Sequence, residues 1–189
     1  MIMLLNGPPR SGKDTIAKII KSKLGNMCSE YKMSKPLKNA FKELLAIDWE
    51  LANHLLEEKK DDPLYSTADA TPRDIQIALS EQVLKPLLGH DALGKIAVNA
   101  LMQFPFKHCV ISDVGFDAEV KPLQERYGYN DVKAIRISRP DTNYDNDSRS
   151  YLDYGPMGIG YEELSNEFDL DLLDRQVHKI LVKWELLDE

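Results

Sequence analysis

The chain has 189 residues, 43% of them apolar and 29% charged, which is enough for one domain whose core needs no disulfide framework. Its net charge is −7, although residues 141–189 alone carry 13 acidic and 4 basic side chains, so the rest of the chain has a small positive excess. A long nucleic-acid track would show a basic stripe, and none is evident, so nucleic acid is not an expected partner. No apolar stretch approaches the length of a membrane span, so no membrane partner is expected.

The two cysteines, Cys28 and Cys109, lie far apart and form no C-x-x-C pair. They indicate buried, reduced thiols, because a disulfide framework would need more cysteines and an oxidising compartment. We therefore expect a soluble protein of the cytoplasm.

The first motif joins an apolar run, residues 1–5, to an amphipathic stretch. The letters G-P-P-R-S-G-K-D-T at residues 7–15 have the G-x-x-x-x-G-K spacing of a loop that holds phosphate between a strand and a helix. The backbone N–H groups of such a loop point into one concavity, where the helix dipole adds positive charge. Because proline has no N–H, Pro8 and Pro9 leave the donors to residues 10–15. The residues expected to bind the nucleotide are Gly7, Arg10, Ser11, Gly12, Lys13, Asp14 and Thr15.

Within this loop, Lys13 is predicted to reach the β- and γ-phosphates and to act in catalysis. The usual motif continues with Ser or Thr, whose hydroxyl holds Mg²⁺, but this chain has Asp14 there and Thr15 one place later. Either Asp14 contacts the metal directly or through water, or Thr15 takes part of the hydroxyl's role. The residues alone leave both alternatives open.

Strands and helices alternate along the rest of the chain. Thr71 is a predicted helix cap, with Pro72 at the first helical position, and this helix is expected to reach about Leu84 before Pro86 and Gly89 interrupt it. The other predicted strands are 28–33, 109–113, 132–138 and 161–165, and the other predicted helices are 15–21, 36–45, 49–59, one capped by Asp91, 117–127 and 168–187. Such alternation predicts an α/β fold of three layers, with a parallel sheet flanked by helices on both faces.

Ligands of such sheets bind beyond the carboxyl ends of the strands. This rule brings the phosphate loop, Asp113 and Arg139 to one rim, although they are distant in sequence. Asp113 is predicted to orient Mg²⁺ or its waters, or to accept a proton from an attacking group. Arg139 precedes a polar segment, residues 141–160, and Arg149 lies within it; this segment is expected to be a mobile loop or a lid. They are candidate cations for a transferring phosphate, since phosphoryl transfer requires positioning and charge neutralisation.

Two further cations are candidates for binding the acceptor. Arg73 lies in the first turn of its helix, where backbone N–H groups already favour anions, so it could hold the phosphate of an acceptor. An ion pair with Asp74 or a neighbour is an equally good interpretation of this arginine. Lys38 is the second candidate.

The motifs resemble those of a known family, the bacteriophage deoxynucleoside monophosphate kinases, a branch of the P-loop NMP kinases in which G-K-D-T is usual. The resemblance extends to P-L-K at residues 36–38, to T-P-R followed by Gln76, to residues 110–119 and to residues 166–177. These segments occur in the family's order and touch most of the chain. The polar segment from Asp141 to Tyr151 matches only loosely.

The resemblance implies a kinase that uses ATP and Mg²⁺ to convert a deoxynucleoside monophosphate into the diphosphate. It also implies one P-loop NTPase domain over residues 1–189 with a five-stranded core, a helical acceptor-binding insertion at about 34–104 and a lid at about 139–160. Arg73, Lys38 and Arg149 would then bind substrate, and a phage-encoded protein would work in the host cytoplasm. Where the family often has arginine after the acid of the third strand, this chain has Gly115, so the contact is missing or comes from Arg136, Arg139 or Arg149.

Two other functions are compatible with the same motifs. One is a P-loop kinase with another acceptor, such as a coenzyme precursor, a phosphorylated metabolite or a hydroxyl on a modified base. The other is a nucleotide-binding ATPase or switch module whose output is a partner contact. The sequence leaves open which bases are accepted and whether the chain forms a homodimer.

Overall fold

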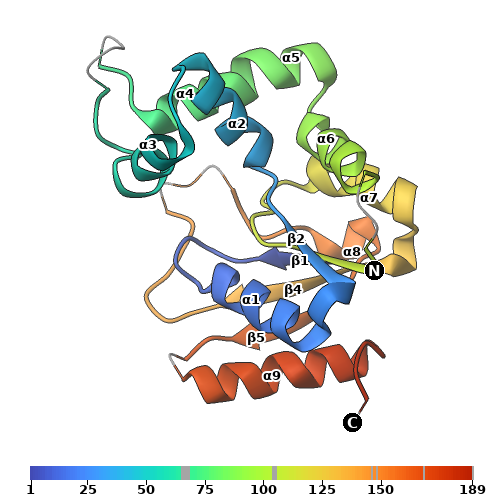
Figure 1. Ribbon diagram of the computed structural model, residues 1–189. Helices are drawn as coiled ribbons and strands as arrows, with labels where there is room; N and C mark the ends of the chain where they lie inside the picture. The colour runs from blue at the N-terminus through green and yellow to red at the C-terminus, as the bar shows by residue number, and fades with distance from the viewer. Residues whose placement is uncertain (65–68, 104–105, 146, 148, 168, 189) are drawn as a thin grey trace.

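A five-stranded parallel sheet forms the centre of the computed structural model, which describes residues 1–64, 69–103, 106–145, 147, 149–167 and 169–188 (Figure 1). The strand order is β2-β3-β1-β4-β5, and every neighbouring pair is parallel. This confirms the predicted sheet. The strands are β1 (Ile2–Asn6), β2 (Cys28–Tyr31), β3 (His108–Ile111), β4 (Val132–Ser138) and β5 (Gly160–Ser165).

Helices cover both faces of the sheet and form a lobe beyond its edge (Figure 1). One face is covered by α1 (Lys13–Leu24) and α9 (Leu170–Lys183), and the other by α6 (Ala92–Leu101) and α7 (Asp117–Tyr127). We call the helices between β2 and α6 the helical lobe. They are α2 (Lys35–Leu44), α3 (Trp49–Asn53) with a π-helical turn (His54–Glu58), α4 (Pro72–Ala78), a second π-helical turn (Leu79–Leu84) and α5 (Lys85–Leu88).

Alternation along β1 builds the two main cores. Ile2 and Leu4 pack into the core beneath α6 and α7, whereas Met3 and Leu5 pack into the core beneath α1 and α9. Because both faces of the strand are buried, its residues form a continuous apolar run, as the sequence indicates. The helical lobe has a smaller cluster of its own around Phe41, which is fully buried.

The prediction that Pro86 interrupts the helix after Thr71 is wrong. The helix continues through α5 and ends at Gly89, which has φ +98°. Just before the proline, the backbone widens into the π-helical turn, where the N–H of Lys85 donates to the carbonyl of Ser80. A turn of this kind accommodates a residue that has no N–H and a bulky ring.

Three smaller expectations also need correction. The second strand ends at Tyr31, so Lys32 and Met33 belong to the connection that leads into α2. Asp91 precedes α6 but its side chain makes no capping hydrogen bond and pairs with Lys95 at 2.8 Å. The last helix begins at Leu170, and Phe168, where it was expected to start, lies outside the described residues.

The polar segment between β4 and β5 is partly packed against the sheet. Leu152, Tyr154 and Ile159 are buried in the core beneath α6 and α7, and residues 154–157 form the short helix α8. The amide of Gln124 on α7 donates to the carbonyl of Met157 at 2.9 Å. Residues 151–160 are therefore not a free lid, and the prediction of a mobile segment is too long at this end. No helix within the described ranges is long and apolar enough to cross a membrane.

Candidate active site

The phosphate loop connects β1 to α1 at the carboxyl edge of the sheet, and close contacts determine its shape. Gly12 has φ +96°, and a Cβ there would meet the amide nitrogen of Asn166 at 2.3 Å. A Cβ on Gly7 would meet the carbonyl oxygen of Ile137 at 2.7 Å. Arg10 also has a positive φ of 64°. Glycine is therefore required at positions 7 and 12, as the motif predicts.

The start of α1 is available to an anion. Gly12 precedes the helix and provides no side-chain cap, so the first N–H groups of α1 are satisfied by no capping side chain. The hydroxyl of Ser11 is fully buried and has no hydrogen-bond partner among the described residues. One expected donor is used within the loop, because the N–H of Ser11 donates to the carbonyl of Pro8 at 3.2 Å. These groups fit the phosphates of a nucleotide.

Lys13 folds back over this loop. Its Nζ donates to the carbonyl of Gly7 at 2.7 Å and to that of Pro8 at 2.6 Å. Burial lowers the pKa of Lys13 to about 8, and the nearby charge of Arg149 adds to this effect. The ammonium is thus partly desolvated, a condition in which its interaction with phosphate is stronger than in water.

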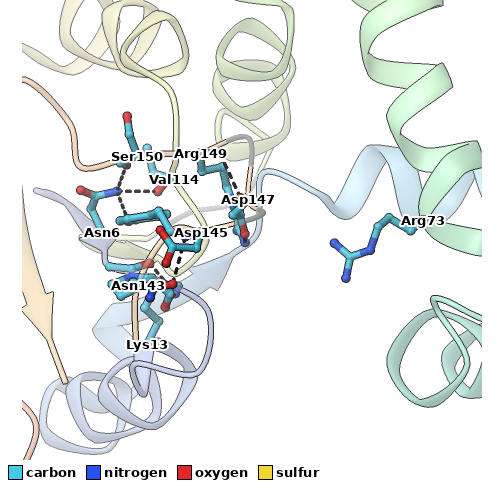
Figure 2. A network of polar contacts seen from close by, with 12 residues as sticks. Asn6, Lys13, Arg73, Val114, Asn143, Asp145, Asp147, Arg149 and Ser150 are labelled. Atoms are coloured by element: carbon cyan, nitrogen blue, oxygen red, sulfur yellow. Dashed lines mark hydrogen bonds and ion pairs between the residues drawn. The ribbon is translucent and has the colours of Figure 1, made fainter. Parts of the chain in front are cut away.

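Two buried asparagines, which the motif analysis did not single out as site residues, make hydrogen bonds in and next to the loop. Asn166, just after β5, donates its amide to the carbonyl of Ser11 at 2.9 Å. Asn6, at the end of β1, donates to the carbonyls of Val114 at 3.1 Å and Ser150 at 3.2 Å (Figure 2). The only sequence signal for Asn6 is a polar residue at the end of an otherwise apolar strand.

The same Asn6 connects β1 to the segment between β4 and β5. Its side-chain oxygen accepts from the N–H of Leu152 at 2.9 Å and from the hydroxyl of Tyr154 at 2.8 Å. Its amide also lies 3.3 Å from the hydroxyl of Tyr144. Since every polar atom of this buried side chain has a partner, Asn6 holds the segment beside the phosphate loop without an unsatisfied group.

The carboxylates predicted to hold magnesium lie at the ends of β3 and the phosphate loop. Asp14 Oδ1 accepts from the hydroxyl of Ser112 at 3.2 Å and forms an ion pair with Lys32 at 2.9 Å. Burial opposes ionisation of Asp14, but the hydrogen bonds from Lys32 and Ser112 and the charges of Lys32 and Lys13 together outweigh it, so the pKa of Asp14 is lowered. Thr15 is exposed in the first turn of α1.

Asp113 is engaged by the connection after β2. Its Oδ1 accepts from the N–H of Met33 at 2.6 Å, and its Oδ2 accepts from the N–H and hydroxyl of Ser34 at 3.0 and 2.7 Å. Asp113 therefore holds the start of α2 in addition to any role toward a metal. The described residues contain no cluster of three or more His, Cys, Asp or Glu side chains suited to a metal. One or two carboxylates beside bound phosphates suit Mg²⁺, which takes few protein ligands, so the residues present fit this ion.

Arg149 lies across Gly115. A Cβ on Gly115 would meet the side-chain carbons of Arg149 at 2.4 Å, so the glycine leaves the space that this side chain occupies. The guanidinium forms a bidentate pair with Asp147, at 2.9 and 2.7 Å (Figure 2). Only 11% of the Asp147 side chain is exposed, so the pair is well shielded.

The other arginines that could supply a cation beside Gly115 are engaged elsewhere. Arg136 stacks over the ring of Tyr151, 4.3 Å from its centroid. Arg139 donates to the carbonyl of Arg10 at 2.9 Å, which places it on the outer side of the phosphate loop. Of these three arginines, Arg149 is therefore the one beside Gly115.

The acceptor candidates lie in the helical lobe. Arg73 pairs with Asp61, with Nε 2.5 Å from the carboxylate, so the expected ion pair exists but its partner is not Asp74. Figure 2 shows its guanidinium pointing toward the side where Asp147 and Arg149 lie, and both of these charges affect the pKa of Arg73. Lys38 pairs with Glu57 and lines a cleft of about 400 Å³. The cleft is lined by Lys21, Glu30, Tyr31, Lys32, Lys35, Lys38, Asn39 and Trp49.

Comparison with known proteins finds sequence similarity to a kinase over the whole length of this chain. No model of a protein family matches the chain. The chain is 26% identical over 190 residues to phosphomevalonate kinase from Drosophila melanogaster, a match that covers all of this chain and 90% of that protein.

Solved structures of similar shape include TT1252 from Thermus thermophilus, with TM-score 0.48 and 15% identity over 97% of each chain. A dephospho-CoA kinase from Campylobacter jejuni has TM-score 0.43 and 15% identity over 96% of each chain. A shikimate kinase from Acinetobacter baumannii has TM-score 0.43 and 12% identity over 96% of this chain and 93% of that one.

The phosphate loop, the parallel sheet that carries it and the similarity to a curated kinase over the whole chain together support a P-loop kinase. The narrower resemblance to the phage deoxynucleoside monophosphate kinases stays a prediction.

Proposed function

We propose that the protein is an ATP-dependent kinase that transfers the γ-phosphate of ATP to an acceptor already carrying a phosphate. Our main candidate for the acceptor is a deoxynucleoside monophosphate, with the diphosphate as product, in the cytoplasm. The observation that carries this proposal is the placement of Arg73 and Arg149. Arg149 pairs with Asp147 at 2.7 Å, and the guanidinium of Arg73 points from the lobe toward this pair (Figure 2). A second anion between the helical lobe and the phosphate loop would meet a guanidinium on each side.

Each candidate residue has a role in this proposal. The N–H groups at the start of α1 and Lys13 bind the β- and γ-phosphates, and Arg139 steadies the loop through the carbonyl of Arg10. Arg149 faces the transferring group from across Gly115. Arg73, with Lys38 further along the lobe, binds the acceptor. Magnesium bound with the nucleotide would neutralise phosphate charge, and Asp14 with Asp113 or Thr15 would hold it directly or through water.

A second acceptor class has support of its own. The relative in Drosophila melanogaster is a phosphomevalonate kinase by name, and the similarity covers all of this chain. A phosphorylated metabolite of that kind also presents a phosphate to Arg73 and Arg149, so the two candidates share the acceptor chemistry. Other acceptors, such as a coenzyme precursor or a modified-base hydroxyl, and a nucleotide-binding switch without turnover, are further alternatives.

The test is a coupled assay of ADP release from ATP and Mg²⁺ with matched acceptor pairs. Each pair contains a phosphomonoester and the same molecule without its phosphate: deoxynucleoside monophosphates with deoxynucleosides, and phosphomevalonate with mevalonate. We expect turnover with a phosphomonoester and none with its dephosphorylated partner. Turnover with deoxynucleoside monophosphates alone supports the main candidate, and turnover with phosphomevalonate alone supports the second.

Two results would contradict the proposal. Equal turnover with a phosphorylated acceptor and its dephosphorylated partner would mean that Arg73 and Arg149 do not recognise an acceptor phosphate. ATP binding without any acceptor-dependent ADP release would favour the switch module.

A further inference from the structure

One short segment contacts both carboxylates at the edge of the phosphate loop. Lys32 forms the ion pair with Asp14, and the next two residues, Met33 and Ser34, hold both oxygens of Asp113. This segment is the connection between β2 and α2, so it joins the sheet to the helical lobe. The donor site and the acceptor lobe thus meet in three consecutive residues.

The position of Lys32 follows from the strand before it. Tyr31 is buried in the core beneath α6 and α7, and side chains alternate between faces at the end of a strand, so Lys32 lies on the side of α1. There its Nζ lies 2.9 Å from Asp14 Oδ1, the same oxygen that Ser112 contacts. Asp14 directly follows Lys13, so the ammonium of Lys32 lies beside the residues that bind phosphate.

The ion pair between Lys32 and Asp14 is weak enough to break when a ligand binds. The side chain of Lys32 is 36% exposed and that of Asp14 is 65% exposed. Exposed pairs of this kind contribute little to stability, because water screens the charges and two side chains must be ordered. A divalent cation carrying nucleotide phosphates would outcompete one ammonium group at the same oxygen.

We propose that Lys32 is an internal counter-ion of Asp14 that competes with the magnesium–nucleotide complex for this carboxylate. Binding of Mg²⁺ and ATP then requires Lys32 to leave Asp14, while Met33 and Ser34 remain on Asp113. The displacement occurs in the segment that leads into α2, so loading the donor site acts on the entry to the acceptor lobe. This inference rests on the proposed function, in which Asp14 contributes to the metal site.

The test measures ATP binding to the full chain by calorimetry at a series of Mg²⁺ concentrations, without any acceptor. For each variant we determine the Mg²⁺ concentration at which half of the increase in ATP affinity is reached. For Lys32→Met we expect this concentration to be about two- to five-fold lower than for the wild type, because an exposed ion pair contributes about a factor of this size. Lys32→Gln is a second variant of intermediate polarity and should change in the same direction. Lys32→Arg keeps a cation that can reach Asp14 and should stay close to the wild type.

Lys35→Met is the matched control. Lys35 lines the same cleft, three residues from Lys32, and no ion pair of Lys35 is found in the part of the chain that the structure describes. The Lys35→Met variant loses one positive charge, as Lys32→Met does, but keeps the ion pair between Lys32 and Asp14. Its Mg²⁺ requirement should therefore equal that of the wild type. Thermal unfolding of each variant checks that the fold is retained.

Several results would overturn the inference. An unchanged Mg²⁺ requirement in both Lys32→Met and Lys32→Gln would exclude competition for Asp14. ATP binding weakened to the same degree at every Mg²⁺ concentration would make Lys32 a phosphate ligand instead. A wild type whose ATP binding does not depend on Mg²⁺ would also exclude the competition. Failure of the wild type to bind ATP at all would instead contradict the proposed function.

Discussion

The phosphate loop and the helical lobe face the same space but are held in place by different kinds of contact. The loop is held by backbone geometry and buried polar groups, with Gly7 and Gly12 closely surrounded and Asn166 hydrogen-bonded to the carbonyl of Ser11. In the lobe, the candidate side chains are held by exposed ion pairs, such as Arg73 with Asp61. In the proposed function, the donor half of the site is therefore formed before any ligand arrives, whereas the acceptor half can rearrange at small energetic cost.

This difference indicates where specificity is set. A phosphate loop that is rigid suits a ligand shared by many enzymes, because only the polyphosphate is recognised. In the proposed function, the acceptor is recognised by side chains that must exchange one carboxylate partner, such as Asp61, for the acceptor's phosphate. Close relatives in fold can therefore differ in acceptor through changes in the lobe alone.

Replacing Lys13 should produce the largest effect and tests the preformed half. Lys13→Ala removes the cation that is predicted to neutralise the transferring phosphate, so kcat/KM should fall by about a thousand-fold or more. Lys18→Ala on the exposed side of the same helix is the matched control. Steady-state kinetics, with circular dichroism to confirm the fold, gives the measurement. Activity within a few-fold of the wild type would place the donor site elsewhere.

The second prediction concerns stability and compares a buried carboxyl group on α7, beside the site, with an exposed one in the helical lobe. Glu119 is buried, and desolvation raises its pKa to about 7 from 4.5, against the hydrogen bonds from the N–H groups of Gly115 and Phe116. The native state therefore holds this proton more tightly than the unfolded state. The stability associated with protonated Glu119 is present below pH 4.5 and is lost as pH rises through about 7.

In Glu119→Gln this loss should disappear. Between pH 4.5 and about 8, the unfolding free energy of the variant should gain up to about 3 kcal/mol relative to the wild type, measured by urea unfolding at each pH. Asp74 in the lobe provides the contrast, because the hydrogen bond from the N–H of Thr71 lowers its pKa. The stability that ionised Asp74 contributes is lost only as pH falls through that lowered pKa. Asp74→Asn should therefore lower the unfolding free energy at neutral pH, which is the opposite of the change expected for Glu119→Gln. If the unfolding free energies of Glu119→Gln and the wild type change with pH in parallel, the raised pKa of Glu119 is contradicted.

The two regions also differ in how much of them the sequence predicts. The strands and the loop between β1 and α1 follow from local patterns, such as the apolar run of β1 and the spacing from Gly7 to Lys13, and the structure confirms both as structural elements, while phosphate binding by the loop stays a prediction. Asn6 was missed as a site residue because its partners lie more than 100 residues away, with Ser150 and Tyr154 at separations of 144 and 148 residues. A buried polar group can be explained only when those partners are known.

The side-chain partners in the helical lobe, and in the connection between β2 and α2, could not be predicted from the sequence either. Lys32 is one of several lysines near the loop in sequence, and nothing local indicates that Asp14 is its partner. The interruption expected at Pro86 followed a sound rule for α-helices, but a π-helical turn before the proline removes the conflict. At Gly115 the sequence left open whether a cation is missing or comes from Arg136, Arg139 or Arg149, and the structure shows that the glycine makes room for Arg149.

Replacing Arg73 tests the adjustable half. In Arg73→Ala the KM for the acceptor should rise by about ten- to hundred-fold, because a charge-assisted contact to phosphate is lost, while the KM for ATP stays near its wild-type value. Arg126→Ala on α7 removes an arginine outside the site and should change neither constant. Asp61→Asn frees Arg73 from its carboxylate and should lower the acceptor KM. A change confined to the ATP KM would move Arg73 to the donor half.

Gly115→Ala should have the smallest effect, and it tests the point where the two halves meet. The added methyl would lie 2.4 Å from the side-chain carbons of Arg149, which must move away, so kcat/KM should fall by about ten-fold. Because the charge of Arg149 contributes to the lowered pKa of Lys13, its displacement should also move the alkaline limb of ATP binding to higher pH. Gly155→Ala is the matched control, since a methyl there meets nothing within 4 Å. A fall in kcat/KM without the change in pH profile would mean that Gly115 affects activity but that Arg149 does not act beside Lys13.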